Sequence, residues 1–180
     1  MSRIGKLPIA IPTGITVEVN GNVVTVKGAK GTLTQEISKN VAVEIQDNNV
    51  LVVRKDESKD SNAKQGLYRQ LINNMIVGLK DGFTKSLTVK GVGYKLSKQG
   101  NKLVMNLGLS HPVEVVEVAG ITLECPDNNT ILVKGADKQL VGAVAAEIKA
   151  LRPMEPYHGY GIHYTSEEVI LKPGKSGKKK

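Results

Sequence analysis

An internal repeat is the sequence feature that most limits how this chain can fold. Three landmarks occur twice and in the same order. Residues 21–26 match residues 100–105, and residues 47–53 match residues 127–133. The third landmark is the dipeptide Lys-Gln, at 64–65 in the first copy and at 138–139 in the second. The first two pairs are offset by 79 and 80 residues; the last is closer because the first copy has an extra polar loop. This order predicts a duplicated fold.

Each copy has the periodicity of strands followed by a helix. Val41, Val43 and Ile45 alternate with other residues, which at a period of two predicts a half-buried strand. The Asp-Asn-Asn runs that follow predict a turn and a hairpin. Two later stripes of apolar residues predict core-facing helices: Leu67, Leu71, Ile72, Met75, Ile76 and Leu79, then Leu140, Val141, Val144, Ile148 and Leu151.

The ends of both helices are also expected from the sequence. Ser61 or Asn62 is predicted to cap the first helix. Asp137 is predicted to cap the second helix and Pro153 to stop it. We therefore predict an α+β fold of two duplicated domains, each an antiparallel sheet covered by one helix.

The expected joint between the repeats is Asp81-Gly82. Residues 1–81 then form an N-terminal α+β repeat, and residues 82–180 form a C-terminal α+β repeat with a basic tail. The longest apolar run, residues 140–146, is far shorter than the roughly 20 residues that cross a bilayer. With a single cysteine and no apolar stretch after the first residues, the chain is predicted to be cytoplasmic and without a membrane partner.

The chain has a formal net charge of +8, which favours an anionic partner. Within the second repeat the positive charge is segregated, because all nine acids lie in residues 114–168. Two flanking segments contain five lysines each and no acid: Lys85, Lys90, Lys95, Lys98 and Lys102, then Lys172, Lys175, Lys178, Lys179 and Lys180. Since a solvated face normally mixes both signs, this pattern predicts a polyanion-binding surface. A solubilising tail beside an incidental lysine strand is the alternative.

Residues 90–95 combine two glycines with two lysines. Gly91 and Gly93 would let backbone amides approach a phosphate that Lys90 and Lys95 neutralise. A β-bulge is the alternative use of such glycines.

A second candidate segment is the loop at residues 156–164, which holds three of the five tyrosines. Its Tyr157, His158 and His163, beside Arg152, can stack on unpaired bases or donate to phosphates. The alternative is a Tyr-rich turn that packs the tail on the domain.

The glycine and histidine patterns argue against a nucleotide-binding, metal-binding or catalytic site. Neither Gly91-Val92-Gly93 nor Gly159-Tyr160-Gly161 has the third glycine of a dinucleotide fingerprint, and Val169 stands where a P-loop needs its first glycine. The three histidines have no cysteine partner at metal-ligand spacing. We predict no catalytic residue, no metal and no cofactor. A nucleotide-dependent enzyme and a protein-scaffolding module are the rival hypotheses.

Seven segments of the chain resemble the bacterial large-subunit ribosomal protein L6 family, and together they span almost the whole sequence. They are residues 2–6, 26–31, 71–75, 91–94, 108–113, 138–142 and 152–157. The resemblance implies a duplicated, non-enzymatic α+β protein of the cytoplasmic ribosome. It implies binding to large-subunit ribosomal RNA, chiefly through the C-terminal domain, near the sarcin–ricin loop and the stalk base. It also implies neighbouring ribosomal proteins as partners and a monomer within the ribosome.

One loop departs from the pattern usual in that family, which has basic residues where this chain has His158, Tyr160 and His163. The loop thereby loses most of its positive charge, because an unperturbed histidine is largely neutral at pH 7. Lys64 and Arg69 are minor candidates in the N-terminal repeat. The predicted RNA-binding set is Lys90, Gly91, Gly93, Tyr94, Lys95, Arg152, Tyr157, His158, His163, Lys172, Lys175, Lys178, Lys179 and Lys180.

Overall fold

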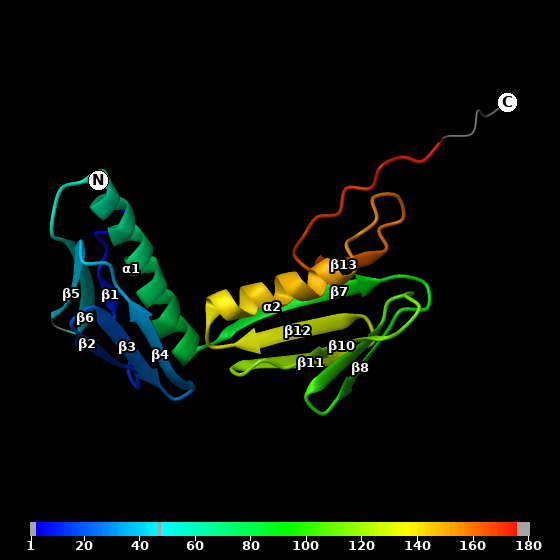
Figure 1. Ribbon diagram of the computed structural model, residues 1–180, viewed down its shortest axis with the longest axis horizontal. Helices are drawn as coiled ribbons and strands as arrows, with labels where there is room; N and C mark the ends of the chain where they lie inside the picture. The colour runs from blue at the N-terminus through cyan, green and yellow to red at the C-terminus, as the bar shows by residue number, and fades with distance from the viewer. Residues whose placement is uncertain (1–2, 47, 176–180) are drawn as a thin grey trace. The chain divides into compact units, whose positions relative to one another are not determined.

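The computed structural model describes residues 3–46 and 48–175 (Figure 1). The chain divides into two compact units. The N-terminal unit comprises Met1–Phe83 with Ala136–Lys138, and the C-terminal unit comprises Thr84–Gly135 with Gln139–Lys180. Each unit has its own sheets and its own helix.

The N-terminal unit contains two three-stranded sheets and one helix. The sheets have the strand orders β1-β6-β5 and β2-β3-β4. The elements are β1 (Ile9–Ala10), β2 (Thr16–Asn20), β3 (Val23–Gly28), β4 (Gly31–Glu36), β5 (Val41–Gln46), β6 (Asn49–Arg54) and α1 (Lys59–Lys80). Helix α1 packs on β3, β4, β5 and β6. Its predicted stripe is buried at Ile72, Met75, Ile76 and Leu79, whereas Leu67 is exposed.

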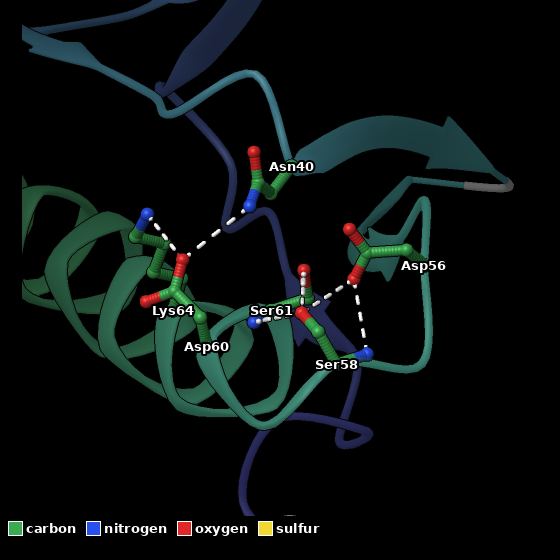
Figure 2. Close-up of polar contacts among 6 residues, drawn as sticks. All are labelled: Asn40, Asp56, Ser58, Asp60, Ser61 and Lys64. Atoms are coloured by element: carbon green, nitrogen blue, oxygen red, sulfur yellow. Dashed lines mark hydrogen bonds and ion pairs between the residues drawn. The ribbon is translucent and has the colours of Figure 1, made fainter.

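Helix α1 begins earlier than the sequence predicted. Its first residue is Lys59, and Ser58 is the N-cap: the Ser58 hydroxyl accepts a hydrogen bond from the Ser61 backbone N–H at 3.1 Å (Figure 2). Asp56 in turn accepts from the Ser58 backbone N–H at 3.1 Å and from its hydroxyl at 2.7 Å. Hydrogen bonds from Ser61 and Ser58 lower the pKa of Asp56. The prediction that Ser61 or Asn62 caps the helix was wrong, because the preceding polar loop supplies the cap.

The C-terminal unit repeats this architecture and adds one strand. Its sheets have the orders β10-β9-β8 and β11-β12-β7-β13. The elements are β7 (Phe83–Lys90), β8 (Lys95–Gln99), β9 (Lys102–Asn106), β10 (Val113–Val116), β11 (Ile121–Asp127), β12 (Thr130–Gly135), α2 (Lys138–Leu151) and β13 (Gly161–Tyr164). Helix α2 begins directly after Asp137 and ends two residues before Pro153, as predicted.

The two copies have matching strand orders, β1-β6-β5 with β7-β12-β11 and β2-β3-β4 with β8-β9-β10. The predicted duplicated α+β fold is therefore confirmed. The structure adds that the strands of each copy form two sheets. Alternating residues indicate which face of a strand is buried but not which strand lies next to it, so the division was not visible in the sequence.

Strand β13 is the element of the C-terminal unit that matters most for its candidate site. It pairs antiparallel with β7, with Gly161 opposite Lys90 and Tyr164 opposite Leu87. Ile162 on β13 and Leu87 on β7 are fully buried, so apolar contacts hold the strand on the sheet. The pairing fixes the position of the chain on both sides of β13.

Candidate RNA interface

Two segments predicted to contact RNA meet at the end of β7 where β13 begins. The turn of residues 91–94 follows β7, and the loop of residues 152–160 joins α2 to β13 (Figure 1). A Cβ built on Gly159 of the loop would lie 3.9 Å from Nζ of Lys90. The structure therefore brings these two distant parts of the sequence together.

Tyr94 joins the turn to the end of α2. Its hydroxyl accepts a hydrogen bond from Nε of Arg152 at 3.2 Å. A Cβ on Gly91 would lie 2.5 Å from carbons of the Tyr94 ring, so Gly91 is needed for the ring to pack. Gly93 has a φ of 75°, which favours glycine in the turn. The close packing of Tyr94 thus explains Gly91 without any ligand.

The positive charge of residues 83–113 is partly cancelled within the small sheet. Lys98 lies 2.8 Å from Glu117, and Lys102 lies 3.0 Å from Glu114. These acids follow in the sequence, but the antiparallel pairing of both β8 and β10 with β9 brings them beside the lysines. Lys90 and Lys95, by contrast, have no ion-pair partner among the described residues. Lys85 has no ion-pair partner there either, but its Nζ lies over the Tyr164 ring, 5.4 Å from the ring centroid. Lys90 and Lys95 are therefore the lysines of this segment with neither an acid nor an aromatic partner among the described residues.

Glu155 organises the loop before β13. Its carboxylate accepts the backbone N–H of His158 at 2.7 Å and that of Tyr157 at 2.8 Å. These hydrogen bonds lower the pKa of Glu155, and the one from the His158 backbone has the largest effect. The Glu155 backbone N–H donates to the carbonyl of Tyr160 at 2.7 Å. The loop is thus a closed turn around an ionised carboxylate.

The same turn presents a pair of stacked rings. The centroids of His158 and Tyr160 are 5.5 Å apart with 17° between the ring planes. Between them, Gly159 has a φ of 71°. Tyr160 is absent from the predicted set. The signal that could have indicated it is an aromatic residue on each side of a glycine, a spacing at which a turn can bring both rings to one side.

His163 lies in the sheet, apart from these rings. It belongs to β13 and pairs with Thr88 of β7, so the prediction that it lies in the loop was wrong. Its Nδ1 is buried and has no hydrogen-bond partner among the described residues. The alternating residues of a four-residue strand are too few to be recognised beside glycines and tyrosines.

The C-terminal tail runs beside the loop. The Lys172 backbone N–H donates to the carbonyl of Pro156 at 2.8 Å. Lys172 and Lys175 are exposed, and neither has an ion-pair partner in the described part of the chain. The predicted contacts Lys178, Lys179 and Lys180 lie outside the described residues.

A shallow hollow lies where these parts meet. It is lined by Tyr94, Arg152, Pro153, Glu155, His158 and Tyr160. Arg152 supplies positive charge in the lining and the stacked rings supply apolar faces, while Nζ of Lys90 lies near Gly159 of the same loop. Such a surface suits an anionic partner that also carries flat rings.

Sequence comparisons identify the family. The family model described as ribosomal protein L6 matches residues 11–82 and 90–165. The chain belongs to the ribosomal protein L6 family. The large ribosomal subunit protein uL6 of Clostridium kluyveri is 53% identical over 99% of this chain and 100% of the relative. The large ribosomal subunit protein uL6 of Desulfitobacterium hafniense is 52% identical over 100% of this chain and 98% of the relative. That of Clostridioides difficile is 52% identical over 99% of this chain and 100% of the relative.

Lys64 and Arg69, the minor candidates for RNA contact in this L6-family chain, form contacts within its N-terminal unit. Lys64 pairs with Asp60 at 2.6 Å, one helical turn away (Figure 2). Nε of Arg69 donates to the carbonyl of Leu7 at 3.3 Å. No group of three potential metal ligands occurs in the described ranges 3–46 and 48–175. No helix there is long and apolar enough to cross a membrane.

Proposed function

We propose that this chain binds large-subunit ribosomal RNA through one end of its C-terminal unit and stabilises the RNA fold during translation. As a member of the ribosomal protein L6 family, it is a structural constituent of the large ribosomal subunit and not an enzyme. The proposed position near the sarcin–ricin loop and the stalk base follows from the family resemblance. The N-terminal unit is proposed to contact neighbouring ribosomal proteins, and residues 1–81 and 82–180 to be the two folding domains.

The distribution of unpaired cations is the observation that supports this proposal. Glutamates neutralise Lys98, Lys102, Lys134 and Lys149 of the C-terminal unit. Among the described residues of this unit, six other cations have no acid partner: Lys85, which lies over the Tyr164 ring, and Lys90, Lys95, Arg152, Lys172 and Lys175. Because unpaired lysines and arginines at a surface attract phosphates, the last five are proposed to neutralise the RNA backbone.

The rest of the predicted set is proposed to complete the same surface. Lys178, Lys179 and Lys180 would extend the cationic tail. The uncharged contacts would be made by Gly91, Gly93, Tyr94, Tyr157, His158 and His163. A mixed surface of this kind positions RNA through its backbone and shape and adds local contacts to bases.

Salt dependence tests the proposal. The five described cations on phosphates give a slope of about −4 for log affinity against log salt, and the three tail lysines would make it steeper; the slope is measured by filter binding to a transcript of large-subunit ribosomal RNA. Lys90→Ala with Lys95→Ala reduces this slope by about 2. The matched control, Lys98→Ala with Lys102→Ala, removes the same charge from ion-paired lysines and leaves the slope nearly unchanged. A salt-independent affinity, or equal effects of the two double variants, would contradict the proposal.

A further inference from the structure

The His158–Tyr160 stack has the properties of a surface prepared for another flat ring. The side chain of His158 is 71% exposed, and Tyr160 is 38% exposed. Aromatic rings normally bury most of their surface, so two stacked and exposed rings forgo much of the free energy that burial provides. Their stack stands at the rim of the hollow that also contains Arg152.

The loop holds these rings in place before any ligand binds. The Glu155 carboxylate accepts hydrogen bonds from the backbone N–H groups of Tyr157 and His158. The Glu155 backbone N–H donates to the carbonyl of Tyr160, so both sides of the turn are held. The Gly159 backbone N–H donates to the Glu155 carbonyl at 3.1 Å, and Lys172 fixes Pro156 from the tail. Because the backbone is already ordered, binding costs little additional conformational entropy.

The charges around the stack favour a base over a phosphate. The ionised Glu155 carboxylate lies 3.3 Å from Nδ1 of His158 and would repel a phosphate placed on the rings. A nucleobase is uncharged and gains from stacking. Lys90 and Arg152, which have no acid partner in the described part of the chain, lie close enough to hold the phosphates on either side of such a base.

We infer that His158 and Tyr160 form a platform on which one unpaired base of the bound RNA stacks. The inference rests on the proposed RNA binding and adds that this loop binds an unpaired nucleotide. The occupant is a single nucleotide that protrudes from a paired region, as in a bulge. A continuous duplex keeps its bases stacked internally and offers none to the platform.

Three labelled RNA hairpins of the same stem test the platform: one fully paired, one with a single bulged adenosine, and one with an abasic residue at the bulge. Fluorescence anisotropy gives the affinity of each for the full chain. We expect the bulged adenosine to bind about tenfold more tightly than the other two hairpins. Tyr160→Leu abolishes this preference, while Tyr160→Phe, the matched control, retains it because the ring remains. Circular dichroism verifies that both variants are folded.

The outcomes separate the inference from the proposed function. Equal affinity of the wild-type chain for all three hairpins overturns the platform but leaves salt-dependent RNA binding intact. The same holds if Tyr160→Leu keeps the preference. Replacing both His158 and Tyr160 by lysine adds charge without aromatic faces, so it should strengthen binding to the paired hairpin and remove the preference for the bulge. Absence of binding to every hairpin and to the ribosomal RNA transcript overturns the proposed function itself.

Discussion

Replacement of Gly91 by alanine tests how the turn after β7 is built. The added Cβ would lie 2.5 Å from ring carbons of Tyr94, where carbon atoms normally stay about 3.5 Å or more apart. The ring therefore has to move by about 1 Å. Gly108, which has no Cβ, lies at the opposite edge of the ring, so the room for the ring to move is on that side and toward solvent.

Two costs follow from that displacement. Overpacking of a well-fitted ring costs about 1–3 kcal/mol. The hydrogen bond from Arg152 to the Tyr94 hydroxyl, already 3.2 Å long, lengthens and loses about 1 kcal/mol. Alanine recovers about 0.4–1 kcal/mol by restricting the unfolded chain. Because Tyr94 is only half-buried and can relax outward, we expect Gly91→Ala to lower the free energy of unfolding by about 2 kcal/mol.

A double-mutant cycle shows whether the ring is the cause. Urea unfolding is followed by amide NMR signals of the C-terminal unit, because the two units can unfold separately. When Tyr94→Ala removes the ring, Gly91→Ala should cost less than about 0.5 kcal/mol, so that nearly the whole effect appears as coupling. An equal cost of Gly91→Ala with and without the ring would refute the reasoning and indicate a backbone requirement at Gly91.

Two further predictions concern the start of α1. Ser58→Ala removes the N-cap and should lower the free energy of unfolding by about 1 kcal/mol, measured by urea titration; an unchanged midpoint would contradict the assigned cap. Asp56 has its pKa lowered by hydrogen bonds from Ser61 and Ser58, so its stabilisation is complete above the ordinary pKa of 3.8 and is lost as the pH falls through the lowered value. Asp56→Asn should therefore flatten the pH dependence of stability below pH 3.8, and the same acid sensitivity in both proteins would rule this out.

Local patterns in the sequence were sufficient for much of the fold. The repeat predicted the duplication, and the stripes that contain Ile72 and Val144 predicted both helices and most of their buried faces. Leu67 and Leu151, which were predicted to face the core, are exposed. The start of α1 was missed because Ser58, Ser61 and Asn62 are all acceptable caps by composition. Only the hydrogen bonds of the folded loop distinguish Ser58 from the other two.

The candidate site was predicted as separate parts. The sequence located the lysines, the glycines around Tyr94 and the aromatic loop, but it assigned Gly91 to a phosphate. The structure shows the Tyr94 ring packed on Gly91, which no spacing rule indicates because the ring folds back over the turn. It also shows His158 stacked on Tyr160, since that contact depends on the φ of 71° at Gly159.

By itself the sequence determined the duplicated α+β fold, the ribosomal protein L6 family and the segments rich in positive charge, because each is encoded by residues close together in the chain. Tertiary structure decided which of those charges remain available. Lys98 and Lys102 are paired with Glu117 and Glu114, whereas Lys90 has no acid partner in the part of the chain that the structure describes. The physical reason is that electrostatic interactions depend on distance in space. The pairing of β8 and β10 with β9 places acids beside lysines that lie in an acid-free stretch of the sequence.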